Sequence, residues 1–556
     1  MEDINIVIGG AAGEGVQTVG AVLAETLISQ GYAVFAWQEF ESRIRGGQNS
    51  YSLRIGESVR NAPLMQADIL LTLNDGASEK YHGRLKEDGV LIGPSGKMDP
   101  AIVISFADLA KERLESGLYA NTIAVGAIIG TLDIPLETLF RVLLPRFEKK
   151  GEKVVSKNRE AAEIGFRMAE EKCRDICPWR LPEREERYHL IDGHEAAALG
   201  AVQAGCRFMA GYPMSPATNL LTFLAKEDER FGVFVEQAED EIAAVNMAIG
   251  ASFAGVRAMT ASSGGGFALM VEAISLAGMI ETPLVIVLAQ RPGPATGLPT
   301  RTAQGDLLFA IHSGHGEFPK AVLAPADPKD AFHQMVFAFN LADQYQIPVI
   351  VLTDQFLADS AFSIADFEVN GSAPEYYLAD PADIQEYRRY RITENGVSPR
   401  LYPGQSRHLV GADSDEHDEF GHITEDLEGI ALDMNRKRLR KVHGLQKEIP
   451  PPTEYRLTSA RTVFVAWGSS RDVVLECMDL LKSDGFDVGL IHFSGVWPLP
   501  EYAFPTGKDY VSVEGNATGQ MARLLENEYG IRIDRHIART DGLPFTADYI
   551  RSRFHE

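Results

Sequence analysis

The chain has 556 residues and a formal net charge of −25, which is enough sequence for three or four domains of about 150 residues each. The acidic balance argues against binding to nucleic acid or to an anionic membrane, because both need faces rich in Lys and Arg. The start, Met1-Glu2-Asp3-Ile4, lacks the basic and apolar regions of a secretory signal, and no apolar run reaches about 18 residues, so we predict a cytoplasmic protein without membrane contact.

A first block of alternating strands and helices is predicted in the N-terminal third. An apolar strand at Ile4–Ile8 runs into the loop Gly9–Gly15 and then a helical pattern. Further strands are expected at Ala33–Ala36, Ile69–Thr72, Gly89–Ile92 and Ile102–Ser105. The alternation predicts a parallel α/β sheet. A charged helical run, Lys149–Arg174, then leads into a linker rich in Pro, Arg and Glu.

Two loops of this block have the composition of anion-binding loops. Gly10, Gly13 and Gly15 stand where a strand gives way to a helix, and glycines there let backbone N–H groups approach an anion. The spacing differs from the dinucleotide fingerprint, so a tight turn without a ligand is an equal alternative. The polar loop Arg43-Ile44-Arg45-Gly46-Gly47-Gln48-Asn49 suits phosphate contact or a subunit interface, and a solvated loop without a ligand is an equal alternative.

A second α/β block runs from Ile191 to about Phe367, and a third runs from Thr462 to the end of the chain. Predicted strands of the two blocks are Phe208–Ala210, Val233–Val235, Ala258–Thr260, Leu284–Leu288, Ala321–Leu323, Ile347–Leu352, Val463–Trp467, Val488–His492 and Tyr510–Val513. Between the blocks, Ala373–Thr453 has no strand and helix alternation, and we predict an extended crossing segment there.

Polar residues of the second block follow its predicted strands. Tyr212-Pro213-Met214-Ser215-Pro216 comes directly after one strand, and ligands of open α/β sheets bind at such carboxyl ends. Glu241 begins an Ala-rich helix, and taken alone it reads as an ordinary acid at a helix N-terminus. Arg291 leaves another strand, nine residues before Thr300, and is suited to bidentate binding of a carboxylate, although a lone arginine is more often structural.

Taken in order, these segments resemble the alpha subunit of the 2-oxoacid:ferredoxin oxidoreductases, of the 2-oxoglutarate synthase type with a gamma domain fused at the N-terminus. Tyr212–Pro216 is similar to the family's Tyr-Pro-Ile-Thr-Pro motif, and Glu236–Met270 matches its cofactor-facing helices. Ser414–Asp426, Trp497–Pro500 and Glu514–Gln520 are similar to other family signatures. In this chain Ser215 replaces the motif's Thr but keeps its hydroxyl group.

The resemblance implies an α/β protein of three domains. These are a Rossmann-like gamma domain with its linker (residues 1–185), a pyrimidine-type thiamine-diphosphate-binding domain (186–370) and a transketolase C-terminal-like domain (457–556). The extended crossing segment occupies residues 371–456.

The resemblance also implies roles for particular residues. Glu241 would hydrogen-bond N1′ of the aminopyrimidine of thiamine diphosphate and so activate the cofactor. Tyr212, Ser215, Arg291 and Thr300 would hold the substrate carboxylate or coenzyme A. The N-terminal loops would contribute to a coenzyme A site or to an interface, through Gly13, Gly15, Arg43, Arg45, Gly46 and Gly47. Glu14, where the family often has Gln, weakens the case for phosphate at the first loop.

Two absences predict a partner. The chain has no Gly-Asp-Gly turn of the kind that holds magnesium diphosphate. Its cysteines, Cys173, Cys177, Cys206 and Cys477, include no CxxC pair and are interpreted as incidental rather than as cluster ligands or disulfides. A beta subunit would therefore supply Mg²⁺, the diphosphate half-site and a [4Fe-4S] cluster, with ferredoxin as the electron acceptor. We expect a heterodimer or a dimer of heterodimers, with no metal ligand in this chain.

The leading hypothesis is an enzyme subunit that makes succinyl-CoA from 2-oxoglutarate in a reversible reaction. The same chemistry on pyruvate, a branched-chain oxoacid or an aryl oxoacid is the alternative within the class. A non-catalytic nucleotide-binding or assembly subunit is the alternative from another class, and it predicts that Glu241→Gln leaves activity intact. A nicotinamide dehydrogenase is disfavoured because the fingerprint spacing is missing.

Overall fold

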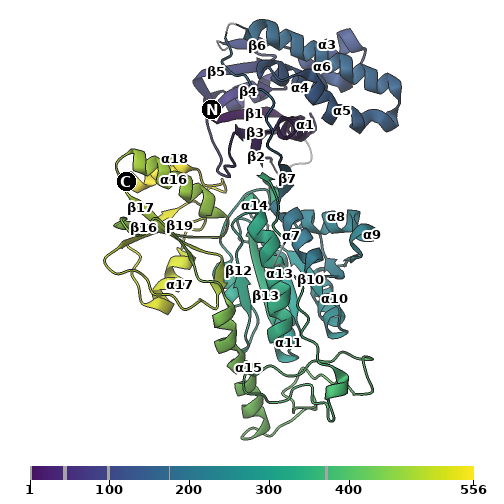
Figure 1. The fold of residues 1–556 in the computed structure, drawn as a ribbon, viewed down its shortest axis with the longest axis vertical. Helices are drawn as coiled ribbons and strands as arrows, with labels where there is room; N and C mark the ends of the chain where they lie inside the picture. The colour runs from purple at the N-terminus through teal and green to yellow at the C-terminus, as the bar shows by residue number, and fades with distance from the viewer. Residues whose placement is uncertain (1–2, 42–46, 97–99, 175, 370–372) are drawn as a thin grey trace. The chain divides into compact units, whose positions relative to one another are not determined.

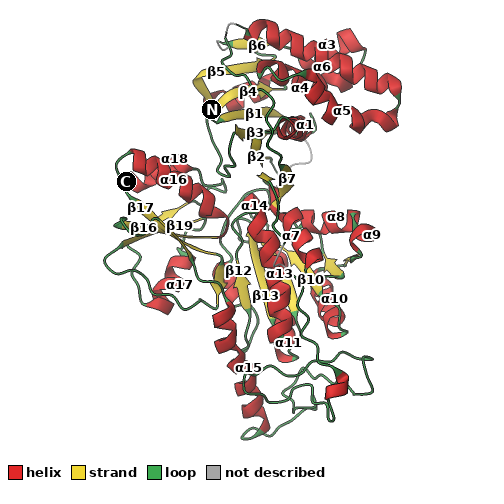
Figure 2. Cartoon of the chain, in the orientation of Figure 1, coloured by secondary structure: helices red, strands yellow, loops and turns green. Residues whose placement is uncertain are grey.

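The structure, a computed structural model, describes residues 3–41, 47–96, 100–174, 176–369 and 373–556. The chain forms two compact units (Figure 1). The first contains Met1–Ile191 and Ser360–Asp366, and the second contains Asp192–Asp359 and Phe367–Glu556. The described chain contains helices and strands throughout, and the strands form three sheets (Figure 2). This confirms the predicted α/β class. No helix in the described ranges is long and apolar enough to span a membrane.

The first unit is built on an eight-stranded sheet of order β6-β5-β4-β1-β3-β2-β14-β7. Its strands are β1 (Ile4–Ala11), β2 (Ala33–Glu39), β3 (Gln48–Gly56), β4 (Ala67–Thr72), β5 (Leu85–Gly93), β6 (Ala101–Val103), β7 (His189–Asp192) and β14 (Ala361–Ile364). The prediction of a parallel sheet is wrong here, because β3 pairs antiparallel with both β1 and β2. This strand was not predicted, although Tyr51, Leu53 and Ile55 alternate with polar residues as a half-buried strand requires.

Helices cover the sheet of the first unit. They are α1 (Val16–Ser29), α2 (Asp75–Tyr81), α3 (Phe106–Leu114), α4 (Ala120–Thr131), α5 (Leu136–Leu143) and α6 (Glu152–Cys173). Cys173 and Cys177 form a disulfide at the end of α6, so their interpretation as unpaired cysteines is wrong. The two residues are four positions apart in the sequence, and their Cα atoms lie 4.8 Å apart, within the range for a disulfide. Cys206 and Cys477 are free and buried.

Helices α4 and α6 cross at glycines. A Cβ atom at Gly165 of α6 would lie 2.0 Å from the carbonyl oxygen of Ile123, and one at Gly126 of α4 would lie 2.2 Å from that of Ala162. Both obstacles are backbone atoms within helices, which cannot move aside as a side-chain tip can.

We therefore expect Gly165→Ala to lower the free energy of unfolding of the chain by about 2–3 kcal/mol, because it overpacks this crossing. Denaturant unfolding measures the loss. The matched control is Gly250→Ala, also in a helix, where nothing lies within 4 Å of the added Cβ atom and a gain of up to about 1 kcal/mol is expected. Equal effects of the two substitutions would contradict the close approach of α4 and α6.

The second unit contains a seven-stranded sheet of order β18-β12-β13-β11-β10-β8-β9. Its strands are β8 (Phe208–Gly211), β9 (Phe234–Gln237), β10 (Ala258–Ser262), β11 (Leu284–Gln290), β12 (Ala321–Leu323), β13 (Pro348–Asp354) and β18 (Gly495–Trp497). All neighbours pair parallel except β18, which comes from the C-terminal block and pairs antiparallel with β12. Every residue of β11 and β13 is buried, as expected of parallel strands covered on both faces.

A five-stranded sheet of order β15-β17-β16-β19-β20 completes the second unit. Its strands are β15 (Thr453–Tyr455), β16 (Thr462–Trp467), β17 (Val488–Phe493), β19 (Asp509–Glu514) and β20 (Arg535–Ala538). The helices of the unit are α7 (Gly193–Gln203), α8 (Thr218–Lys226), α9 (Asp228–Phe231), α10 (Glu241–Phe253), α11 (Gly264–Met279), α12 (Leu307–Ile311), α13 (Pro328–Tyr345), α14 (Gln355–Asp359), α15 (Ile430–Glu448), α16 (Arg471–Ser483), α17 (Gln520–Tyr529) and α18 (Ala547–His555). Helix α15 lies within the stretch predicted as an extended crossing segment and was missed.

Candidate active site

The candidate site lies at the carboxyl ends of the parallel strands β8 to β11, the edge at which open α/β sheets bind ligands. Glu241 is the first residue of α10, directly after the loop that follows β9. The preceding residue, Asp240, caps the helix by accepting a hydrogen bond from the backbone N–H of Ala243 at 2.7 Å. Because Asp240 performs the capping, the Glu241 carboxylate is not needed for it.

The Glu241 side chain is buried and incompletely paired. Only 3% of the residue is exposed, and its Oε1 atom has no hydrogen-bond partner among the residues that the structure describes. The hydroxyl groups of Thr260 and Ser263, on and just after β10, are also buried and have no partner within the described ranges. Buried polar atoms are nearly always satisfied in folded proteins. Three buried oxygens on α10 and at β10 are thus without a partner among the described residues, which is compatible with binding of a polar group there.

Gly266, in the first turn of α11, leaves the space in which the carboxylate lies. A Cβ atom there would be 2.4 Å from Oε1 of Glu241 and 2.1 Å from Oγ of Ser262. Both distances are too short for any side chain at this position. The glycine thus brings the start of α11 against Glu241.

The loop after β8 connects this carboxylate with the arginine after β11. Arg291 donates a hydrogen bond from Nη1 to the backbone carbonyl oxygen of Ser215 at 2.6 Å, while the Ser215 residue is exposed. In the same loop, Sδ of Met214 lies 3.8 Å from Oγ of Ser262. The structure therefore brings Ser215 and Arg291 together and joins their loop to the strand beside Glu241. Tyr212 is 41% exposed, and Thr300 is half-buried, further along the loop that begins at Arg291.

Asp306 was missed by the sequence reasoning. Burial raises the pKa of its carboxyl group to about 6, although the charge of Arg291 opposes the rise. Burial lowers the pKa of Arg291, and Asp306 opposes that change. Gln290, at the end of β11, accepts a hydrogen bond from the backbone N–H of Asp306 at 3.0 Å. Fifteen residues separate the two charged groups, and no local pattern indicates their pairing.

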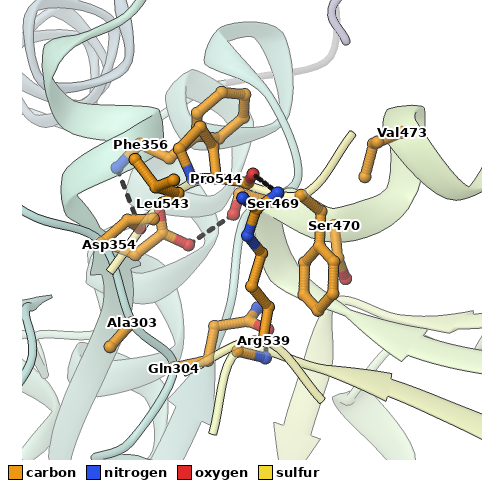
Figure 3. A pocket seen from close by; sticks show the side chains of 13 residues that line it. Ala303, Gln304, Asp354, Phe356, Ser469, Ser470, Val473, Arg539, Leu543 and Pro544 are labelled. Carbon is orange, nitrogen blue, oxygen red and sulfur yellow. Dashed lines mark hydrogen bonds between the residues drawn. The ribbon is translucent and has the colours of Figure 1, made fainter. Parts of the chain in front are cut away.

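Gln304 fastens the loop that carries Arg291 to the C-terminal block. It donates from Nε2 to the carbonyl oxygen of Trp467 at 3.0 Å, and its Oε1 accepts from the N–H of Gly515 at 2.9 Å. Beside it is a cavity of about 30 Å³, room for about one water molecule. Asp354, Ser469 and Arg539 lie along its wall (Figure 3). None of the predicted site residues lines this cavity, which is a packing feature behind the loop.

The N-terminal loops belong to the first unit. Gly13 and Gly15 have φ of 90° and 86°, which only glycine adopts readily. Oε2 of Glu14 accepts hydrogen bonds from the N–H of Ala11 at 2.8 Å and from Nδ2 of Asn74 at 2.5 Å, so this loop supplies its own anion. Gly47 has φ of 77°. Arg43, Arg45 and Gly46 lie outside the described residues.

Comparisons with known proteins agree with this geometry. The family described as pyruvate flavodoxin/ferredoxin oxidoreductase, thiamine diphosphate-binding, matches residues 199–436. The pyruvate ferredoxin/flavodoxin oxidoreductase family matches residues 5–168. The 2-oxoacid:ferredoxin oxidoreductase subunit alpha of Saccharolobus solfataricus is 32% identical, over 99% of this chain and 96% of its own length. The chain belongs to the 2-oxoacid:ferredoxin oxidoreductase alpha-subunit family.

Two more relatives of this alpha subunit are informative. The 2-oxoglutarate synthase subunit KorA of Archaeoglobus fulgidus is 35% identical, over 61% of this chain and 90% of its own length. A solved structure of 2-oxoglutarate:ferredoxin oxidoreductase from Magnetococcus marinus superposes with a TM-score of 0.90, at 32% identity, over 100% of this chain and 99% of that one. That enzyme was solved with 2-oxoglutarate, coenzyme A and succinyl-CoA bound. The predicted enzyme class, oxidoreductase acting on 2-oxoacids, is confirmed.

Proposed function

We propose that this alpha subunit, together with a second subunit, catalyses the reversible thiamine-diphosphate-dependent oxidative decarboxylation of 2-oxoglutarate to succinyl-CoA, with ferredoxin as electron acceptor. The observation that carries the proposal is the buried Oε1 atom of Glu241, which has no partner within the described chain. Two relatives, a 2-oxoglutarate synthase subunit and a 2-oxoglutarate:ferredoxin oxidoreductase, support this substrate over pyruvate, branched-chain or aryl oxoacids.

The residues around Glu241 fit the aminopyrimidine half of thiamine diphosphate. Oε1 of the buried Glu241 carboxylate has no hydrogen-bond donor among the described residues, and the lack of a side chain at Gly266 leaves space beside it. When bound, the cofactor supplies an electron sink for the loss of carbon dioxide. Glu241 would hold the proton of a ring nitrogen and so set the protonation state of the cofactor.

The residues after β8 and β11 fit an anionic substrate. The Arg291 guanidinium group is held against the Ser215 backbone and offers donors for a carboxylate. The exposed hydroxyl of Ser215 and the side chains of Tyr212 and Thr300 would complete the contacts with 2-oxoglutarate or coenzyme A. We also propose that the N-terminal loops contribute to a coenzyme A site or to an interface. The residues concerned are Gly13, Gly15 and Gly47, together with Arg43, Arg45 and Gly46, which lie outside the described residues.

A beta subunit would carry the diphosphate site, Mg²⁺ and the [4Fe-4S] cluster, in a heterodimer or a dimer of heterodimers. The family of this chain, in which curated relatives are named as alpha subunits, supports such a partner. We also propose the domain division at residues 185, 370 and 456. The two matched family regions, 5–168 and 199–436, fall on either side of the first of these boundaries.

Reconstitution with the beta subunit tests the proposal. Coenzyme A acylation and ferredoxin reduction are measured with 2-oxoglutarate, pyruvate, a branched-chain oxoacid and an aryl oxoacid. We expect kcat/KM to be highest for 2-oxoglutarate, and no turnover without the beta subunit. Preference for another oxoacid would overturn the substrate. Tight binding of thiamine diphosphate by the alpha subunit alone would overturn the division of the cofactor site.

Asp306 predicts a pH dependence of substrate binding. Because its pKa is raised to about 6, its negative charge disappears as pH falls below 6, and the Arg291 cation is no longer offset. We expect KM for the 2-oxoacid to fall about threefold between pH 7 and pH 5. Asp306→Asn should show the low-pH KM throughout this range. A variant that keeps the wild-type pH profile of KM would contradict the assignment.

A further inference from the structure

The first unit contains a cavity whose lining includes none of the residues proposed above for the reaction. It has a volume of about 520 Å³, within the range of about 300–1,000 Å³ typical of small-molecule sites. Its lining residues come mainly from α1, α4, α6 and the turn Leu144–Lys150 that follows α5. Glu241 and Arg291 belong to the other unit.

The interior of the cavity is suited to an apolar body. Aliphatic and aromatic side chains form most of its wall: Val19, Val22, Val125, Leu143, Phe147 and Val154. Four uncharged polar side chains also line it, Thr18, Asn121, Thr122 and Asn158. Thr122 and Asn158 are already paired with each other at 2.8 Å, and Asn158 also donates to the carbonyl oxygen of Val154 at 2.9 Å. Because most of the wall is apolar, a polar guest would lose much of its hydration there.

The edge of the cavity is positively charged. Arg146 and Lys150 line it, and the lining within the described chain includes no carboxylate, although the chain as a whole carries a net charge of −25. Arg146 pairs with Glu25 of α1. Lys150 has no carboxylate partner among the residues described, and its Nζ lies 5.4 Å from the centre of the Phe147 ring. An anionic group at this edge would meet at least one uncompensated cation.

One further side chain extends the apolar wall to the entrance of the cavity. Leu118 lines the cavity and is 89% exposed, on the turn Gly117–Tyr119 that leads into α4. A single exposed leucine is ordinary on a protein surface. At the entrance of an apolar cavity it extends the apolar wall outward, so a guest longer than the cavity would still be in contact with the chain.

We propose that this cavity binds an amphiphilic carboxylate, with its unbranched hydrocarbon chain among the valines and Phe147 and its carboxylate beside Lys150 and Arg146. Fatty carboxylates of medium length have this chemistry. This proposal does not rest on the proposed oxidoreductase function, so the failure of one would leave the other unaffected.

Calorimetric titration of the full-length chain with hexanoate, octanoate and decanoate tests the proposal, at concentrations below micelle formation. We expect one site per chain, with affinity rising about fourfold for each buried methylene. Decanol, which has the same chain without the charge, should bind about fivefold more weakly than decanoate. The absence of saturable binding by decanoate, or equal binding of all three acids, would overturn the proposal.

Substitutions locate the site. Val154→Phe, at a half-buried position on α6, should weaken decanoate binding at least tenfold by filling the cavity. The double substitution Arg146→Gln with Lys150→Gln should weaken decanoate about fivefold and leave decanol unchanged, and it keeps the test decisive if the phenylalanine variant does not fold. Lys149→Gln is the matched control, because this exposed cation does not line the cavity.

Coenzyme A serves as a competitor in the same titration. We expect it to leave decanoate binding unchanged, because most of the wall is apolar. Displacement of decanoate by coenzyme A at equal concentrations would overturn the proposal and assign the cavity to a nucleotide. An unchanged decanoate affinity in both the Val154→Phe and the double variant would also overturn it, because the fatty acid would then bind elsewhere.

Discussion

Glu241→Gln should lower the kcat of the reconstituted enzyme for 2-oxoacid by about a thousandfold, within the range of about 10²–10⁴ that proton transfer by a positioned side chain contributes. The amide has the shape of the carboxylate but cannot take up a proton. Two of the three atoms nearest to a Cβ at Gly266 belong to Glu241. KM for the 2-oxoacid should change little, because the substrate contacts are assigned to Arg291 and its neighbours. Steady-state kinetics at saturating thiamine diphosphate measure both constants.

Glu239→Gln is the matched control for this experiment. Glu239 lies two residues earlier and is exposed, so its substitution should leave kcat within twofold of the wild type. Gly266→Ala should resemble Glu241→Gln, because the added methyl group would displace the carboxylate. A Glu241→Gln enzyme with kcat within tenfold of the wild type would favour the alternative of a non-catalytic assembly subunit.

Much of the candidate site could be predicted from the order of its motifs. The positions after β8 and β11 follow from hydrophobic strands that end in Tyr212–Pro216 and at Arg291, since the carboxyl ends of parallel strands meet at one edge. The choice of Glu241 over Glu239 rested on the family resemblance, and no composition or spacing favours it. Asp306 and Gln304 could not be predicted, because their partners lie on distant strands and blocks and become neighbours only when the chain folds.

The missed elements have identifiable physical causes. Strand β3 begins with Gln48 and Asn49, so its polar start was read as the continuation of a loop, although the residues after it alternate. Helix α15 was missed because its buried face carries cations: Lys437 and Lys441, spaced as i and i+4, are 0% and 1% exposed. A search for apolar residues at helical spacing does not detect such a face. The two lysines can be buried because a carboxylate lies against this face of the helix.

That carboxylate belongs to Glu281. Its Oε1 atom lies 2.6 Å from Nζ of Lys437, and its Oε2 atom lies 2.5 Å from Nζ of Lys441. Arg389 donates to the Glu281 carbonyl oxygen at 2.6 Å. Burial would raise the pKa of Glu281, but the three cations hold it below its usual range. Burial lowers the pKa of Lys437 to about 7 despite the nearby carboxylate. The cluster joins α15 to the loop after α11.

We expect Glu281→Gln to lower the free energy of unfolding at pH 7 by about 3–5 kcal/mol, the usual cost of removing one partner from a buried ion pair. The lysines would remain buried without their counterion. One of the lysines could instead lose its proton. Because a lysine in water has a pKa of about 10.4, this deprotonation costs about 5 kcal/mol at pH 7. Urea unfolding, followed by circular dichroism, measures the difference.

Glu386→Gln provides the control. Glu386 pairs with Arg388 at 2.7 Å, within the segment 371–456 that contains α15, but its side chain is 62% exposed. Its loss should cost less than about 1 kcal/mol, as for most surface ion pairs. The two variants thus remove the same chemical group from a buried and a solvated pair. If Glu281→Gln were no more destabilising than Glu386→Gln, the lysines of α15 would have to reach solvent, and the burial of this face of the helix would be wrong.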